Sequence, residues 1–156
     1  MVECAIVPQP EVPTIGIRST VPLNRMKEFF GESYGRLYGE IGREGVAVSG
    51  MPFGRYRGMP TDIVDVEAGV PIAEPTEGHD DIVAGTLPAT EAVEAVHVGP
   101  YDTLEQTYNE MVEWMSEHNL VPADDMWEFY LTDPADQPDP RKWETKVVWP
   151  VMSVTV

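Results

Sequence analysis

The chain has 156 residues, of which 42% are hydrophobic and 9% aromatic. This composition is typical of a globular protein, so the high charge does not indicate disorder, and the chain has enough apolar residues for the core of one compact domain. The 27 acidic and 10 basic residues give a formal net charge of −17, a field that repels phosphate backbones and argues against direct nucleic-acid binding. Salt adaptation or simple solubility explains such acidity as well as the attraction of cations does.

The N-terminal region and the cysteine content bear on location. Cys4 is the single cysteine, so the chain has neither an intrachain disulfide nor a paired-cysteine metal or redox motif. Residues 1–13 contain acidic residues and prolines where a signal peptide needs an apolar core. No apolar run approaches the roughly 20 residues of a membrane helix. We therefore expect a cytoplasmic protein with a free thiol and no membrane partner.

The first half of the chain predicts a strand, a helix and two strands. Apolar residues at helical spacing from Met26 to Ile41 indicate a helix that begins at Pro22 or Leu23. Its three glycines at positions 31, 35 and 39 each weaken it by about 1 kcal/mol relative to alanine. Runs rich in β-formers predict the strands Thr14–Thr20, Val46–Phe53 and Ile63–Val70.

The second half repeats this pattern after a crossover loop at Ala73–Thr90, which holds one short predicted strand at Ile82–Thr86. Helical spacing from Leu104 to Met115 predicts a helix that ends near Asn119. Asp102 and Glu105 have the spacing of a capping box at its start. The predicted strands are Glu91–Val98, Trp127–Leu131 and Thr145–Val156.

The two halves align with each other. Pro71 and Pro150 end similar strand patterns 79 residues apart, and the two helix patterns lie 78 residues apart. We therefore predict a single domain, residues 1–156, made of two repeats at about 12–72 and 90–156. A strand-helix-strand-strand unit leaves an apolar sheet face and an edge uncovered, and pairing two units covers both. The predicted fold class is α+β, with one mostly antiparallel sheet and two helices on one face.

Several segments carry a family resemblance. The second half contains VHVGPYDTL, EWMSEHNLVP, WEFYLTDP and WETKVVWPV, and the earlier part contains DIVDVEAGVPI and GTLPATEAVEAVHVGPY. Together these segments resemble the GyrI-like family, whose members also occur as effector-binding domains of AraC-type and MerR-type regulators. The resemblance covers most of the chain from about Val12 onward, and we expect a stand-alone member of that family.

The resemblance implies a duplicated strand-helix-strand-strand fold with a ligand groove on the pseudo-twofold axis. The buried acid of the family corresponds to Glu128, and the tyrosine beside it to Tyr130. Many members have Thr-Glu in the last strand, whereas this chain has Thr145-Lys146, so no carboxylate role carries over to that position. Glu144 is the one nearby acid that could replace it.

Strand alternation places Glu128 and Tyr130 on one face, and Trp127, Phe129 and Leu131 on the other. We expect the apolar set to pack on the helices and Glu128 to face the groove. A buried carboxylate is costly unless it is paired, hydrogen-bonded or protonated, and a bound cation among aromatic rings offsets that cost. The alternative is a half-buried glutamate bonded to Tyr130 or an arginine.

Other candidate ligand contacts are aromatic or apolar. Trp143 can stack on a planar ligand at the groove rim and Tyr101 can form a wall, although each can also simply pack on the core. Met51 and Phe53 lie where the opposite wall is expected, with core packing as the alternative. The lone histidines have no metal-ligand spacing, and no cofactor motif occurs, so we expect neither a metal nor a cofactor.

Three functions follow from this pattern. The first is binding of a small, largely apolar molecule, cationic or aromatic, for effector sensing, sequestration or multidrug binding, alone, as a homodimer or with a partner regulator. The second is hydrolysis of strained, cyclopropane-bearing natural products with Glu128 as the catalytic base. The third is inhibition of a DNA enzyme by the acidic surface, which ranks last because the acidic residues are dispersed along the chain.

Overall fold

The computed structural model describes residues 2–58 and 61–153 and divides the chain into two compact units. Unit 1 combines Met1–Gln9 with Thr90–Val156, and unit 2 is Pro10–Ala89. The chain therefore enters unit 2 after its first strand and returns to unit 1 at Thr90. That the two sequence repeats superpose stays a prediction.

Unit 2 is an antiparallel sheet with one long helix. Its strands follow the order β3-β4-β2-β5, and each neighbouring pair is antiparallel. The elements are β2 Val12–Pro22, the 3₁₀ turn Leu23–Arg25, α1 Met26–Glu44, β3 Phe53–Arg57, β4 Ile63–Pro71 and β5 Val83–Leu87.

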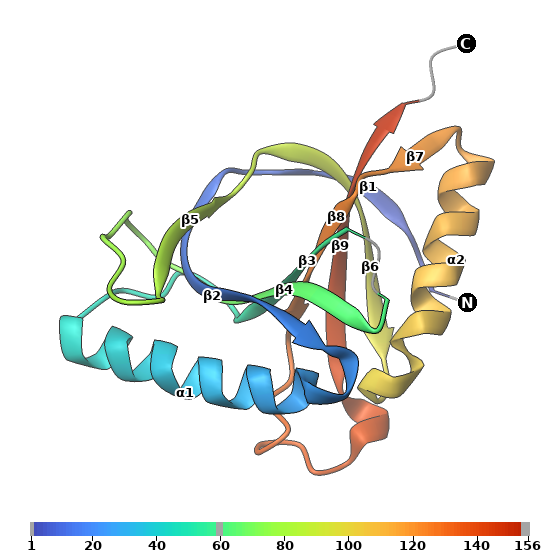
Figure 1. Cartoon of the computed structure of the whole chain (residues 1–156). Helices are drawn as coiled ribbons and strands as arrows, with labels where there is room; N and C mark the ends of the chain where they lie inside the picture. Colours follow the sequence, from blue (N-terminus) through green and yellow to red (C-terminus); the bar gives the residue numbers. More distant parts are fainter. Residues whose placement is uncertain (1, 59–60, 154–156) are drawn as a thin grey trace. The chain divides into compact units, whose positions relative to one another are not determined.

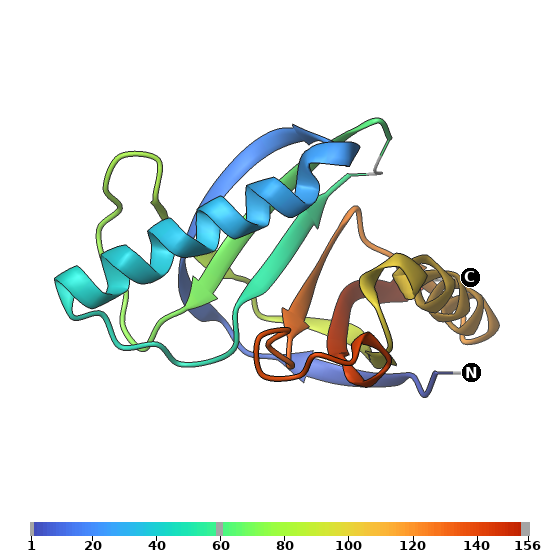
Figure 2. The same ribbon diagram turned by 90° about the horizontal axis from the view of Figure 1, so that it is seen from below.

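Helix α1 lies over β2 and β4, as Figure 2 shows. Alternate residues of these two strands face it and form the core of unit 2 with Leu37. Four glycines along α1 face solvent, and a Cβ added at any of them would meet nothing within 4 Å. Seven side chains of unit 2 that are at most 2% exposed are Ile15, Leu37, Phe53, Val66, Ala68, Val70 and Ile72.

Unit 1 is also an antiparallel sheet with one helix. The strands follow the order β1-β6-β9-β8, and β7 also pairs with β9. Helix α2 lies beside β6 and β7 (Figure 1). The elements are β1 Ala5–Gln9, β6 Thr90–Val98, the 3₁₀ turn Tyr101–Thr103, α2 Leu104–Glu117, β7 Leu120–Pro122, β8 Asp125–Tyr130, the 3₁₀ turn Pro140–Lys142 and β9 Glu144–Ser153.

These elements confirm the predicted α+β class with antiparallel strands, but one predicted strand is wrong. The segment Val46–Phe53 contains only an isolated bridge from Val48 to Ile72, and the strand there, β3, begins at Phe53. Gly50 and Pro52 explain the shift, since proline removes a ladder donor and glycine weakens a strand interior.

Two local features also differ from the expectations. The predicted Asp102–Glu105 capping box is wrong, because α2 follows a 3₁₀ turn and its N-cap, Thr103, makes no side-chain capping bond. Strand β1 was not predicted since Pro8 lies within it. Proline is tolerated there because β1 pairs on one side with β6 and forms the edge of unit 1. Residues 154–156 of the predicted last strand lie outside the described residues.

Neither helix of the described chain combines the length and the apolar character that a membrane span needs. Cys4 lies just before β1, is half-buried and forms no disulfide. Burial is the larger cause that raises the pKa of its thiol, and the negative charge of Glu110 is the second. Both disfavour the thiolate, so Cys4 is a poor nucleophile at neutral pH.

Candidate functional site

Glu128 is a buried carboxylate in the middle of β8. Only 1% of the residue is exposed. Its Oε2 accepts a hydrogen bond from the hydroxyl of Tyr108 on α2, and its Oε1 accepts one from Tyr130 at 3.3 Å. Burial of a charge costs free energy, and the two hydroxyl donors offset part of that cost. The surroundings of this position therefore suit a carboxylate better than an apolar side chain.

The bond from Tyr108 places Glu128 on the face of the sheet that α2 covers. The expectation that Trp127, Phe129 and Leu131 pack on the helices is therefore wrong for unit 1. Phe129 lies on the opposite face, where the Lys146 ammonium is 5.4 Å from its ring centroid. On one face of the sheet, Tyr108 of α2 donates a hydrogen bond to the Glu128 carboxylate. On the other face, the Phe129 ring lies near the positive charge of Lys146.

Aromatic rings gather around this carboxylate in unit 1. Tyr101 meets Tyr130 edge to face with 5.8 Å between the ring centroids, and it meets Trp143 in a tilted arrangement with 5.0 Å between the centroids. Tyr108 meets Trp149 edge to face at 6.2 Å. We call these five residues and Glu128 the aromatic cluster. A carboxylate surrounded by ring faces and edges is an arrangement that recognises organic cations.

The electrostatics of Tyr101 link it to the carboxylate. Burial raises the pKa of the Tyr101 phenol, and the negative charges of Glu128 and Asp133 raise it further. Tyr101 is still 39% exposed, unlike Glu128. It therefore forms the solvent side of the cluster, and the carboxylate lies beneath it.

The Gly-Pro-Tyr turn sets the position of Tyr101. Gly99 has φ +138°, which side-chain-bearing residues rarely adopt, and its N–H donates to the Trp143 carbonyl at 2.8 Å. The Trp143 indole N–H donates to the Gln137 carbonyl at 2.7 Å. The turn and the loop before β9 are thus joined, and the exposed ring of Tyr101 and the half-buried ring of Trp143 are held against each other.

His97 joins β6 to the start of α2. Its Nε2 lies 3.0 Å from the Pro100 carbonyl oxygen, which can only accept, so the proton is on Nε2. Its Nδ1 then accepts from the Thr107 hydroxyl at 2.6 Å. With both ring nitrogens satisfied, His97 has a structural role and is not a free metal ligand. In the described part of the chain, no three His, Cys, Asp or Glu side chains are grouped as metal ligands would be.

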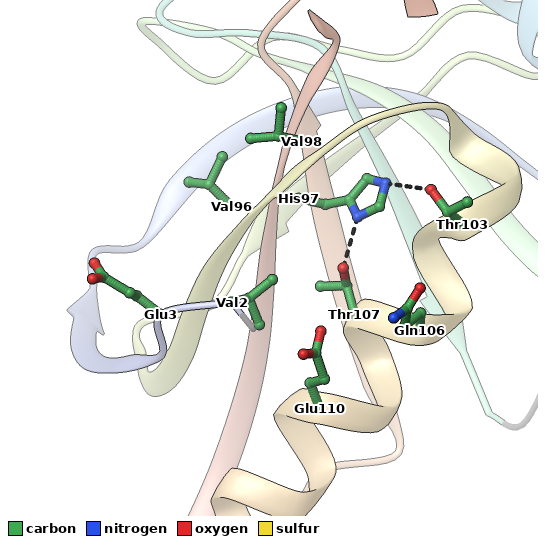
Figure 3. Close-up of a pocket in the computed structure, with 9 residues that line it drawn as sticks. All are labelled: Val2, Glu3, Val96, His97, Val98, Thr103, Gln106, Thr107 and Glu110. Atoms are coloured by element: carbon green, nitrogen blue, oxygen red, sulfur yellow. Dashed lines mark hydrogen bonds between the residues drawn. The ribbon is translucent and has the colours of Figure 1, made fainter. Parts of the chain in front are cut away.

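A surface hollow of about 650 Å³ lies beside His97, which forms part of its lining. Figure 3 shows His97 between Thr103 and Thr107, with Glu110 further along the helix. No member of the aromatic cluster is among the residues that line this hollow, and no sequence pattern predicted it. Its lining residues are Val2, Glu3, Val96, His97, Val98, Thr103, Gln106, Thr107 and Glu110.

The structure brings four of the six sequence-predicted site residues together, namely Glu128, Tyr130, Tyr101 and Trp143. The other two belong to unit 2, where Phe53 is 1% exposed and Met51 is 41% exposed. Their role in an opposite wall stays a prediction.

Sequence reasoning missed Tyr108 and Trp149. Tyr108 counted only as an apolar position of the helix pattern, and Trp149 only as part of the strand before Pro150. The hydroxyl of Tyr108 could have indicated its role, because a tyrosine hydroxyl on the buried face of a helix needs a hydrogen-bond partner.

The GyrI-like family model, described as GyrI-like small molecule binding domain, matches residues 3–152. Among solved structures, EcmrR in its complex with DNA has a TM-score of 0.86 at 21% identity. The alignment covers 98% of this chain and 58% of that chain, so this chain spans little more than half of EcmrR. The EcmrR C-terminal domain has a TM-score of 0.82 at 24% identity, with 99% of both chains covered.

Two further structures are similar in fold. A hydrolase encoded by lin2189 from Listeria innocua has a TM-score of 0.68 at 16% identity, covering 96% of this chain and 92% of that one. SAV2435 bound to tetraphenylphosphonium has a TM-score of 0.65 at 13% identity, covering 96% and 94%. No curated protein matches the sequence.

Proposed function

Because the chain belongs to the GyrI-like small molecule binding domain family, we propose that it binds a small, largely apolar molecule, cationic or aromatic, at the aromatic cluster of unit 1. The observation that carries this proposal is the carboxylate of Glu128, which is 1% exposed and bonded by Tyr108 and Tyr130. Binding of this kind serves effector sensing, sequestration or multidrug binding.

The energetics favour a cationic ligand over a neutral one. A carboxylate in a low-dielectric site attracts a cation more strongly than it would in water. Aromatic faces add an attraction of about 0.5 to 2 kcal/mol for a cation within roughly 6 Å of a ring centroid. Tyr101 is the exposed ring of the cluster and Trp143 contacts it, so we expect a ligand to reach Glu128 when these two move aside.

Two structural neighbours support this reading. SAV2435 binds tetraphenylphosphonium, a lipophilic cation without hydrogen-bonding groups, so the same fold accommodates such a ligand. EcmrR combines a similar domain with DNA binding, which supports an effector-sensing role alongside a partner regulator.

A pair of probes tests the role of charge in the wild-type protein. Tetraphenylphosphonium should bind in isothermal titration calorimetry, and triphenylphosphine oxide, an aromatic molecule without net charge, should bind at least about tenfold more weakly, since it makes no ion contact with Glu128. Equal affinity for the two probes, or no binding of either, would contradict the proposal.

Hydrolysis is the second candidate. The observation that favours it is the pair of phenols beside Glu128, which could orient water next to a catalytic base. The fold likeness to the Listeria innocua hydrolase agrees with it. In that case Glu128→Gln would leave substrate binding intact and abolish turnover, whereas a binding protein would lose affinity.

A further inference from the structure

Thr145, in β9, has a fully buried hydroxyl that the aromatic cluster does not use. The residue is 0% exposed, and within the described residues its Oγ1 has no hydrogen-bond partner. Buried hydroxyl groups are nearly always hydrogen-bonded, because an unpaired one loses its bonds to water without replacement. A buried hydroxyl without a hydrogen-bond partner needs an explanation, and a hydrogen bond to a bound ligand is one.

The register of the sheet places this hydroxyl next to the aromatic cluster. Thr145 is the cross-strand partner of Tyr130 on β8 and of His97 on β6. Directly paired residues point to the same face, so Thr145 lies on the face that carries Glu128 and Tyr130. Trp143, two residues before Thr145, contacts Tyr101, which in turn contacts Tyr130.

Neighbouring side chains do not satisfy the hydroxyl. His97 uses Nδ1 for Thr107 and Nε2 for Pro100, and the Tyr130 hydroxyl donates to Glu128. Val147, the next residue of β9 on this face, is apolar. The Thr145 hydroxyl is thus a buried hydrogen-bond donor that none of these neighbouring side chains satisfies, on the sheet face that carries Glu128.

We propose that Thr145 is a specificity-determining ligand contact, an inference that rests on the proposed function. Its hydroxyl donates to an oxygen of a ligand whose cationic part lies at Glu128. Glu128 pairs with Val147, which is two residues from Thr145, so the two contacts are roughly 7 Å apart along the strand. The ligand class is therefore a lipophilic cation that carries a hydroxyl, ether or carbonyl oxygen roughly 7 Å from its charge.

A matched pair of probes tests this assignment by calorimetry. Pentyltriphenylphosphonium and (4-hydroxybutyl)triphenylphosphonium have the same number of heavy atoms, and only the second carries a terminal oxygen. Thr145→Val keeps the shape of the side chain and removes the donor. We expect this variant to bind the hydroxybutyl probe on the order of tenfold more weakly than wild type, the size of one lost hydrogen bond, and the pentyl probe within about twofold. Thr145→Ser, which restores a donor, should behave as wild type with both.

Thermal unfolding without ligand separates this role from a structural one. If the hydroxyl has no partner in the free protein, Thr145→Val should unfold at the same or a higher temperature than wild type. A lower unfolding temperature would mean that the hydroxyl is already satisfied, for example by a buried water, and would overturn the inference.

The binding data also distinguish the role of Thr145 from ligand binding at the aromatic cluster as a whole. If both probes bind wild type and Thr145→Val changes neither or changes both equally, the assignment of Thr145 is wrong while the proposed function stands. If neither probe binds wild type, the proposed function fails and the assignment fails with it.

Discussion

Glu128→Gln should bind tetraphenylphosphonium about 5- to 150-fold more weakly than wild type, while its stability without ligand stays equal or rises by up to about 1 kcal/mol. The binding loss corresponds to about 1 to 3 kcal/mol, the scale of a lost contact to a buried charge. The amide still accepts from Tyr108 or Tyr130, and its burial costs less than that of a charge. Calorimetry and urea unfolding of both proteins measure the two effects.

Glu105→Gln is the matched control, since Glu105 is an exposed carboxylate on α2 of the same unit. It makes the same change in net charge, so it reports any effect of the overall −17 field on a cationic probe. We expect it to bind as wild type. If the two variants lose affinity equally, the loss comes from the change in net charge of the protein and not from the aromatic cluster. If Glu128→Gln changes neither binding nor stability, Glu128 is not part of a binding site.

Gly69→Ala should destabilise the protein by about 1 to 3 kcal/mol, the usual cost of overpacking a core. The ring of Phe53 packs directly on Gly69, so an added Cβ would lie 2.3 Å from its Cζ and 2.8 Å from both Cε atoms. Phe53 is 1% exposed and is paired with Gly69 across β3 and β4, so neither can move aside easily. Urea unfolding, read as the midpoint at constant slope, measures the change.

Two further variants interpret the Gly69 result. Gly35→Ala, on the exposed face of α1 with nothing within 4 Å, should instead stabilise by about 0.5 to 1 kcal/mol through helix propensity. Phe53→Leu should lessen the damage of Gly69→Ala in the double variant because it removes the clashing ring. An increase in stability for Gly69→Ala, like that expected for Gly35→Ala, would show that the ring does not lie on the glycine.

Element type followed from the sequence where apolar periodicity and turn residues agree. The helix pattern from Met26 to Ile41 became α1, and the run from Glu91 to Val98 became β6. The start of β3 was wrong by several residues because Gly50 and Pro52 interrupt an otherwise apolar run. Strand β1 was missed because Pro8 is unfavourable inside a sheet and acceptable only at an edge, and an edge is a property of the fold.

The candidate site could be predicted only in part, because strand alternation groups residues on one face of a sheet without showing what covers that face. Strand alternation correctly grouped Glu128 with Tyr130, but it contains no information on which face meets a helix. The apolar character of Trp127 and Phe129 pointed to the wrong face, since a helix tyrosine can satisfy a buried acid. The orphan hydroxyl of Thr145 was out of reach, because whether a hydroxyl is paired depends on its three-dimensional neighbours.

A crystal structure of the protein with tetraphenylphosphonium tests the central claim most directly. We expect the phosphonium in unit 1 with its phenyl rings against the aromatic cluster, Tyr101 and Trp143 moved from their present contact, and Glu128 facing the cation. The contrary result is a bound phosphonium that leaves Tyr101 and Trp143 in place and lies in the hollow beside His97 and Glu110, because it would assign recognition to surface carboxylates and not to Glu128.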